Sequence, residues 1–471
     1  MKMIRLGLVL ACGATLTACA LQTQKLSPPT PLAAIAPPEW QAPLPHNGKL
    51  LDLTNWWQHQ GDALLAQWIT AAQVQSPTIA QAGARIAQSR AERVASGAQL
   101  LPTLDAAASI SRMSQQSLQP MGTTTQIGVQ SAWEIDVFGA RRASLDAAKA
   151  RLDGAQSSWH EARVSVAAEV ANQYYSLRAC RQLLIVAQQD AQSRADTARL
   201  TELSAQAGFQ APAAAALARA SAAEASNRAT QQRALCDLDL KAMVALTGLA
   251  EPQLRTELDQ SRTGNSVDNA AVQAPAFALA ALPAQTLRQR PDVYSAERDV
   301  AAASYDVGGA QAQRYPRLSL SGLVGLGSFR SGGEQLQATA WTIGPLQLSV
   351  PLFDAGRRRA NVDAAIARYE LAVVNYRARV RQAVREVETA LVNLDSSAAR
   401  SVDAQTALDG YRVFFSATDG RYRNGLSSLL ELEDARRKRL AAENAVVTLQ
   451  RERNLAWIAL YRAAGGGWTA P

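Results

Sequence analysis

The chain is poor in the side chains from which catalytic and metal sites are usually built. Its 471 residues include only three histidines and four cysteines, and these are scattered along the sequence. Metal cages need several such ligands close together, and His-dependent catalysis needs a partnered imidazole. The sequence also lacks a nucleophile elbow, a phosphate-binding loop and a recognisable pair of catalytic carboxylates. We therefore expect neither an enzyme nor a bound metal or other cofactor.

The sequence also lacks long apolar runs and large clusters of residues with charge of one sign. Aromatic residues make up 6% of the chain, and the mean hydropathy of -0.12 differs from that of a protein with many membrane helices. The 48 Lys and Arg exceed the 40 Asp and Glu, giving a net charge of +8, but the basic residues are interspersed with acidic ones. Because nucleic-acid binding needs a basic patch, we expect no nucleic-acid partner.

The first residues indicate export from the cytoplasm. A short basic start and an apolar stretch that ends at Leu16 are typical of a signal peptide, here 1–18, and are too short to span a bilayer. The ending before Cys19 resembles a bacterial lipobox, which implies cleavage and a lipid anchor on that cysteine. An ordinary signal peptide cut near Ala18 is the alternative. Residues 19–50 contain seven prolines and predict an extended tether.

The body of the chain is two copies of one plan. Pro77 and Pro102 are 25 residues apart, as are Pro291 and Pro316, and equivalent positions in the two copies stay 214 to 217 residues apart. So constant an offset indicates a duplication. The predicted organisation is repeat 1 over 51–250, a linker over 251–275 and repeat 2 over 276–465.

Each copy holds two stretches with the two-residue period of a strand. Apolar side chains such as Ile127 and Val129 alternate with polar ones, which predicts strands with one face in lipid or core. The alternation changes phase near 344–345, where we expect a β-bulge or the end of regular pairing. The strands, each of roughly ten residues and long enough to span a bilayer when tilted, are predicted within 103–112, 123–137, 318–326 and 346–352.

After the strand stretches of each copy, heptad spacing predicts unusually long helices. Proline is absent from 141 to 203, and apolar residues recur at alternating spacings of four and three in both copies. Each long helix is expected to break once, at Gly208 and at Gly425, and so to form a hairpin with the helix that follows. Many alanines outside the seam would allow close approach on a second side, as a closed tube of helices requires. A solvated coiled-coil rod explains the heptads equally well, but not the strands.

Four strands cannot close a barrel, and an open edge in hydrocarbon leaves unpaired backbone groups that cost several kcal/mol each. Two copies would give eight strands around a filled interior, whereas three would give twelve around a lumen. We therefore predict a mainly α fold with a small β part. Long antiparallel helical hairpins form an α-barrel in a homotrimer, and four transmembrane strands per chain complete a 12-stranded β-barrel in outer membrane lipid.

Short motifs recur in order in both repeats. They are Arg290-Pro291-Asp292-Val293, Tyr315-Pro316, Phe138-Gly139 with Arg141-Arg142, and Phe353-Asp354 with Gly356-Arg357. This set resembles the TolC-type outer-membrane efflux lipoproteins of the NodT group. The resemblance implies a trimeric, lipid-anchored exit duct whose helical tube lies in the periplasm. Such a duct passively conducts small molecules such as drugs, with a periplasmic adaptor (membrane fusion) protein and an inner-membrane pump of the resistance-nodulation-division type as partners.

The resemblance also suggests residues that close the duct. Matching the family pattern at the end of the second hairpin places Leu430 and Asp434 as candidate constriction rings and Arg421 and Tyr422 as candidate latch residues. Three carboxylates near a channel axis would attract cations. The alternative is that the charged residues of 431–439 form a solvated helix face with ion pairs one turn apart.

Clusters of arginine lie where strands give way to helices. Cations at a helix start oppose the helix dipole, so we predict that anionic headgroups at the membrane interface offset this effect. Ordinary solvated helix starts remain the alternative. The candidate interface residues are Arg141, Arg142, Arg357, Arg358 and Arg359.

Cys180 and Cys236 are each 28 residues from Gly208. An antiparallel hairpin that turns at this glycine would bring the two cysteines to equal height, and the periplasm permits disulfides. Equal height does not ensure that the side chains face each other, so two buried free thiols remain the alternative.

Two other functions fit parts of the pattern. A duct for type I protein secretion would have the same fold, whereas a non-transporting coiled-coil structural lipoprotein would need no trimer that requires detergent. The predicted function is therefore an outer-membrane exit duct, with these two as alternatives.

Overall fold

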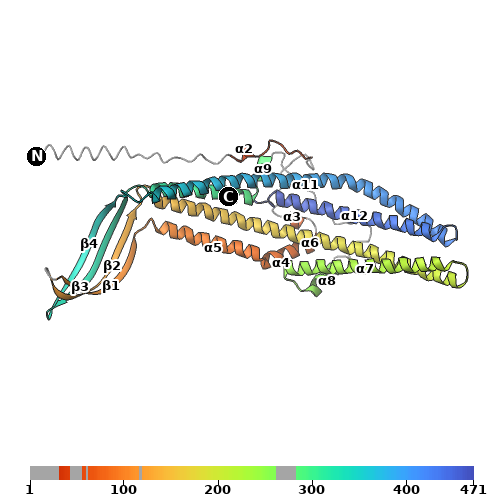
Figure 1. Cartoon of the computed structure of the whole chain (residues 1–471), viewed down its shortest axis with the longest axis horizontal. Helices are drawn as coiled ribbons and strands as arrows, with labels where there is room; N and C mark the ends of the chain where they lie inside the picture. Colours follow the sequence, from red (N-terminus) through yellow and green to blue (C-terminus); the bar gives the residue numbers. More distant parts are fainter. Residues whose placement is uncertain (1–30, 43–55, 60–61, 116–118, 261–282, 471) are drawn as a thin grey trace. The chain divides into compact units, whose positions relative to one another are not determined.

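The computed structural model describes residues 31–42, 56–59, 62–115, 119–260, 283–470. Figure 1 shows the helices and strands of the chain. The described residues form two compact units. Within the described residues, unit 1 contains Ala84–Gln156 and Ser295–Arg377, and unit 2 contains Pro31–Gly83, Ser157–Tyr294 and the rest of the chain from Ala378. The signal peptide and Cys19 lie outside the described residues.

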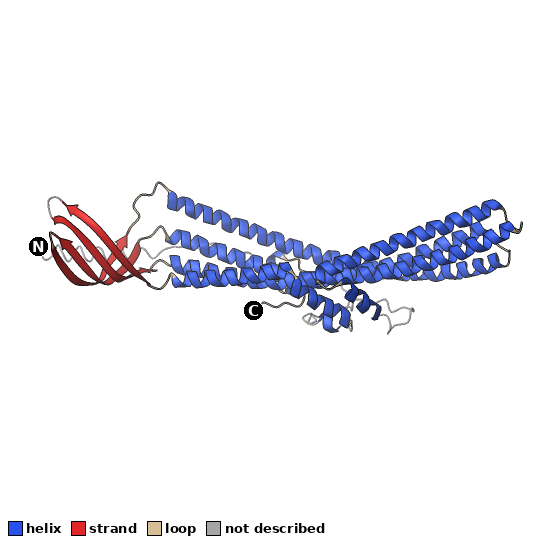
Figure 2. Cartoon of the chain, turned by 90° about the horizontal axis from the view of Figure 1, so that it is seen from below, coloured by secondary structure: helices blue, strands red, loops and turns tan. Residues whose placement is uncertain are grey.

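The described strands of unit 1 form one antiparallel sheet (Figure 2). Its strand order is β1-β2-β3-β4. The two predicted strand pairs are present, and β2 of the first repeat pairs with β3 of the second, so that the repeats share one sheet. The expected length of about ten residues was wrong, because backbone ladders continue through polar residues beyond the alternating stretches. The strands are β1 (Thr103–Gln115, 13 residues), β2 (Gln119–Ile135, 17), β3 (Arg317–Ser331, 15) and β4 (Glu334–Ser349, 16).

The predicted β-bulge is confirmed. Leu320 pairs with Leu346 and Gly322 with Ile343, so that Gly344 and Pro345 add an extra residue to β4 at this point. An extra residue reverses the side-chain phase of the strand. Leu346 therefore returns to the same face as Ile343, although the numbering changes from odd to even.

Two helices of 67 residues carry the long heptad patterns. They are α6 (Ala140–Gln206) and α11 (Arg357–Arg423), and each is followed by a shorter antiparallel partner, α7 (Pro212–Thr247) and α12 (Leu429–Ala463). The predicted breaks are confirmed, since Gly208 and Gly425 have positive φ values of 83° and 72°. A glycine adopts this conformation without the clash that a Cβ atom would cause. A shorter helix also precedes each pair of strands, α5 (Pro77–Ala98) in the first repeat and α10 (Pro291–Ala312) in the second.

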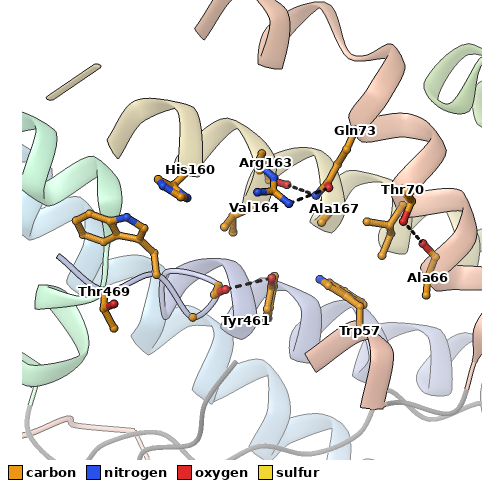
Figure 3. A pocket seen from close by; sticks show the side chains of 14 residues that line it. Trp57, Ala66, Thr70, Gln73, His160, Arg163, Val164, Ala167, Tyr461 and Thr469 are labelled. Carbon is orange, nitrogen blue, oxygen red and sulfur yellow. Dashed lines mark hydrogen bonds between the residues drawn. The ribbon is translucent and has the colours of Figure 1, made fainter. Parts of the chain in front are cut away.

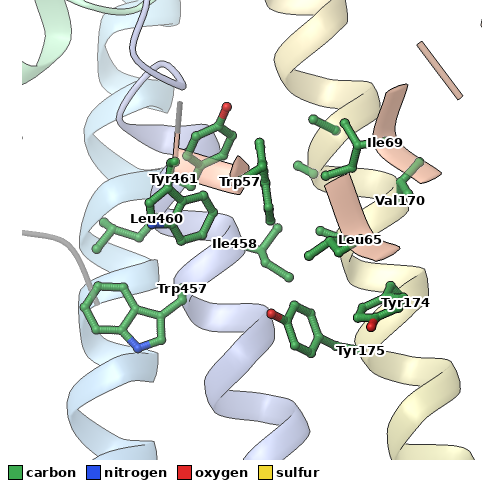
Figure 4. Packing of buried hydrophobic residues seen from close by; sticks show 14 of the residues in the cluster. Trp57, Leu65, Ile69, Val170, Tyr174, Tyr175, Trp457, Ile458, Leu460 and Tyr461 are labelled. Atoms are coloured by element: carbon green, nitrogen blue, oxygen red, sulfur yellow. The ribbon is translucent and has the colours of Figure 1, made fainter. Parts of the chain in front are cut away.

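The core of unit 2 is aromatic and is built from several short helices around the long ones. Trp56 of α3 (Trp56–His59) stacks on Tyr461 of α12, with ring centroids 4.7 Å apart. Trp68 of α4 (Ala63–Gln75) meets Tyr174 of α6 edge to face at 5.5 Å. These rings and the aliphatic side chains between them form one buried cluster (Figure 4).

The segment predicted to be a linker, 251–275, begins with a helix, α8 (Glu251–Gln260). Its Leu254 and Leu258 are buried in the aromatic core, so this part of the chain is packed. These two leucines are four residues apart, but one such spacing within ten residues does not distinguish a helix from a loop. The next helix in the described part of the chain, α9 (Pro283–Arg288), lies near the start of the second repeat.

Part of the proline-rich tether is also ordered against unit 2. A single helical turn, α2 (Leu32–Ile35), occupies a proline-free run of the segment that we expected to be wholly extended. Farther along, Trp40 and Ala42 are buried in the core. The backbone N–H groups of Gln41 and Ala42 donate to the carboxylate of Glu388 at 2.7 and 2.9 Å.

Candidate functional site

The sheet of unit 1 has one continuous apolar face. The register places Ile127 opposite Leu326 and Val129 opposite Val324, and Val324 lies opposite Trp341. Exposed apolar surface on this scale marks an interaction site, here with lipid. The exposed apolar residues that share this face are Leu104, Ile110, Ile127, Val129, Val324, Leu326, Trp341, Ile343, Leu346 and Leu348.

The two outer strands of this sheet are open. Within the described residues, β1 pairs only with β2, and β4 pairs only with β3. Each outer edge therefore presents unpaired backbone groups, which cannot remain unpaired in hydrocarbon.

No helix in the described part of the chain is both long and apolar enough to span a membrane.

The strand-to-helix junctions hold their arginines with carboxylates of the same chain. At the start of α6, the carboxylate of Asp136 accepts the backbone N–H groups of Arg141 and Arg142 at 3.1 and 2.9 Å. The Arg141 guanidinium also donates to Glu134 at 2.9 Å and to Gln99 at 2.6 Å. A carboxylate at the helix start offsets the unfavourable effect of these cations on the dipole.

The second repeat repeats this arrangement around Asp354. Its carboxylate accepts from the Arg358 guanidinium at 2.7 Å and from the backbone N–H of Gly356 at 3.1 Å. Arg357 and Arg359 are exposed. Headgroup binding by the five arginines thus stays a prediction, and the local carboxylates are a compensation that the sequence interpretation missed.

The four candidate gate residues lie at the end of the second hairpin in unit 2. Leu430 is 71% exposed. Asp434 forms ion pairs with Arg437 at 2.5 Å and with Lys438 at 2.8 Å. Hydrogen bonds from these two side chains, Lys438 first, lower the pKa of Asp434, so that it is charged at neutral pH.

The two candidate latch residues differ in what they join. The hydroxyl of Tyr422 lies 3.2 Å from that of Thr201 on α6, so Tyr422 links the second hairpin to the first. Arg421 instead donates to the carbonyl of Leu426 at 3.1 Å, within its own turn. The structure thus brings Tyr422, but not Arg421, into contact with the first hairpin.

A second polar link between the hairpins escaped the sequence interpretation. Arg194 on α6 pairs with Asp190 on its own helix at 2.9 Å, and with Glu433 on α12. Arg436, which is 2% exposed, donates to Glu433 at 2.9 Å and to Thr197 at 2.7 Å. The alternative interpretation placed Glu433 and Arg436 on a solvated helix face. Their spacing could not exclude it, because ion pairs one turn apart occur on solvated and on buried faces alike.

The Arg-Pro-Asp motif at the start of α10 joins three segments of unit 2. The Arg290 guanidinium binds the Asp292 carboxylate at 3.0 and 2.7 Å and Glu386 on α11 at 2.7 Å. It also donates to the carbonyl of Ala463 at 2.9 Å. Burial acts to lower the pKa of Arg290, but its bonds to Asp292 and Glu386 outweigh this effect and raise the pKa. The motif therefore fixes the start of repeat 2 to the end of α12.

Cys180 on α6 and Cys236 on α7 are both buried, and their sulfurs are bonded with the Cα atoms 5.5 Å apart. This geometry matches the hairpin arrangement that the equal spacing from Gly208 predicted. Among the described residues no group of three or more His, Cys, Asp or Glu side chains could hold a metal ion.

An apolar sheet face with open edges, together with long helical hairpins, defines a class of outer-membrane channel proteins. The family model described as outer membrane efflux protein matches residues 68–249 and 282–466. The chain belongs to this family.

Individual relatives agree with this assignment. The chain is 29% identical to the pyoverdine export outer membrane protein OpmQ of Pseudomonas aeruginosa, over 99% of this chain and 98% of that protein. It is 30% identical to the toluene efflux pump outer membrane protein TtgI of Pseudomonas putida, over 79% and 78% of the two chains. Among solved structures, that of the outer-membrane channel OprN superposes with a TM-score of 0.78 at 27% identity, covering 94% of this chain and 98% of that one.

The predicted fold class and resemblance are thus confirmed. The protein is an outer-membrane efflux channel, an exit duct with a helical tube in the periplasm. Members of the family are channel proteins.

Proposed function

We propose that three copies of this chain assemble into the exit duct of a tripartite efflux system. The duct passively conducts small molecules from a periplasmic adaptor and an inner-membrane pump to the exterior. The observation that carries this proposal is the four-stranded sheet with one apolar face and two open edges. Three such sheets joined edge to edge satisfy the backbone of β1 and β4 and enclose a lumen.

Small organic molecules are the cargo that the relatives favour. Their names refer to pyoverdine export and toluene efflux, and both compounds are small compared with a protein. A duct for type I protein secretion is therefore the less favoured alternative. The coiled-coil structural lipoprotein is disfavoured by the apolar sheet.

The chain itself is proposed to be neither an enzyme nor an energy transducer. The pump supplies the driving force, and the duct supplies a path with a closable end. We place the lipid anchor on Cys19, the closing rings at Leu430 and Asp434, and the link that closes the hairpins at Tyr422, with Arg421 bracing the turn beside it.

Deletion of the gene tests this function. We expect the deletion strain to become more sensitive to a panel of drugs, dyes and metal ions, and the wild-type gene on a plasmid to restore tolerance. Unchanged tolerance to the whole panel, with the protein present in wild-type outer membranes, would count against export. A matched strain carries the Ile127→Lys variant, which changes the apolar face of the sheet and leaves the sequence of the helices unchanged. Its drug tolerance shows whether export depends on that face.

A further inference from the structure

Unit 2 contains a cavity of about 550 Å³ that none of the candidate anchor, interface or gate residues lines (Figure 3). Its walls come from three regions that are far apart in sequence: α3 with α4, α6, and α12 with the segment that follows it. Small-molecule sites commonly occupy about 300 to 1,000 Å³, so the volume suits a ligand of moderate size.

The segment after α12 is shaped to form one wall of this cavity. Gly465, Gly466 and Gly467 all have positive φ values, of 89°, 61° and 84°. A Cβ atom on Gly466 would lie 2.5 Å from the side chain of Val164, so only glycine allows so close an approach. The turn brings Trp468 back toward α6, where its ring lies 6.3 Å from that of His160.

The cavity is lined by aromatic rings and by a positively charged group. Rings of Trp57, His160, Tyr461 and Trp468 line it, together with the guanidinium of Arg163, and none of the 14 described lining residues is a carboxylate. Burial, and to a smaller degree the charge of Arg163, lower the pKa of His160, so this imidazole is neutral at pH 7.

Arg163 is exposed, and among the described residues it has no acidic ion-pair partner. Its guanidinium lies over the ring of Trp159, 4.9 Å from the centroid, and donates weakly to Gln73 at 3.5 Å. No carboxylate in the described part of the chain forms an ion pair with it. The cation–π contact with Trp159 favours this position of the guanidinium and leaves its remaining N–H groups available to an anion.

We propose that this cavity binds a small organic anion with a planar aromatic body. The carboxylate of the ligand pairs with Arg163 through two parallel N–H donors, which suit the geometry of a carboxylate. The aromatic body packs against Trp57, Tyr461 and Trp468 in offset or edge-to-face contacts. The inference does not rest on export.

Calorimetric titration of the full-length protein in lipid nanodiscs tests the proposal, with 2-naphthoate as the probe and empty nanodiscs as the blank. We expect saturable binding of one probe per chain. Arg163→Gln should weaken binding about tenfold or more, because a charged hydrogen-bonded partner is lost. Arg163→Lys, which keeps the charge without the planar fork, should weaken it less. Trp468→Leu should also weaken it, because one wall loses its ring.

The matched control is Arg199→Gln, which removes an exposed arginine of unit 2 that does not line the cavity. It should bind the probe like the wild type. The uncharged 2-naphthylmethanol should bind at least about tenfold more weakly than the carboxylate. Absence of saturable binding, equal affinity for the neutral analogue, or wild-type affinity in Arg163→Gln would each overturn the proposal. Thermal melting of each variant shows whether it is folded, and the Lys variant remains informative if the Gln variant is not.

Discussion

At the scale of single residues, we expect ion pairs between buried charges to matter more for the stability of the fold than pairs between exposed charges. Arg194 is 7% exposed and contacts Asp190 and Glu433, whereas Arg437 is 77% exposed and pairs with Asp434 at the surface. Removing one partner of a buried pair leaves an uncompensated charge, while an exposed pair is screened by water. The two arginines therefore form a matched comparison on neighbouring helices.

We expect Arg194→Met to destabilise the protein by about 3 kcal/mol, because Asp190 and Glu433 lose their shared buried cation and keep only Arg228 at 3.3 Å and Arg436 at 2.9 Å. Arg437→Met should cost less than about 1 kcal/mol. Denaturant unfolding of the detergent-solubilised protein measures both. Equal effects of the two substitutions would contradict the assignment of Arg194 as the structural link between the hairpins.

The candidate constriction gives a second prediction at this scale. Leu430→Ala combined with Asp434→Ala should raise the conductance of the purified protein in planar bilayers, because both constriction rings are then removed. A substitution of the exposed Arg199 provides the control. A closed state unchanged in the double variant would exclude these two residues as the gate.

At the scale of elements, the first hairpin is held by a covalent cross-link as well as by packing. Cys180 and Cys236 join α6 to α7 across a sequence separation of 56 residues. We expect thiol counting on denatured, unreduced protein to find neither cysteine free. Two free thiols would show that the hairpin is held by packing alone.

The sheet provides a prediction in which neighbouring residues of one strand behave differently. Ile127 lies on the apolar face of β2, and Gln126 points to the other face. Ile127→Lys should destabilise the inserted sheet by about 2 to 4 kcal/mol, because the charge faces lipid, whereas Gln126→Lys should be tolerated. The fraction of protein that resists heat and detergent in outer membranes measures the effect. Similar behaviour of the two variants would argue that the face of Ile127 does not meet lipid.

Sequence periodicity predicted the strands and the long helices more successfully than it predicted where strands end or which side chains are buried. Alternation fixed which face of β2 carries Ile127, and heptads together with Gly208 and Gly425 fixed the long helices and their turns, because these features repeat over many residues. Strand ends, the packing of α8 and the burial of Arg436 were not predictable. Each depends on contacts between segments far apart in the chain, and a short polar or amphipathic stretch has the same appearance whether it is packed or solvated.

At the scale of the whole molecule, the low mean hydropathy is explained by the small part of each chain that meets lipid. A mean hydropathy of -0.12 is compatible with an outer-membrane protein, because only one face of four strands needs to be apolar. The same four strands have two open edges, which a single chain cannot satisfy. Several copies of the chain must therefore assemble so that the edges of their sheets pair with one another. The closed barrel that results provides the duct.

Native mass spectrometry of the protein released from detergent micelles tests this central claim most directly. The account predicts one dominant species with the mass of three chains, because three sheets of four strands enclose a lumen. A single chain, or two chains whose eight strands would leave the barrel filled by side chains, would contradict it.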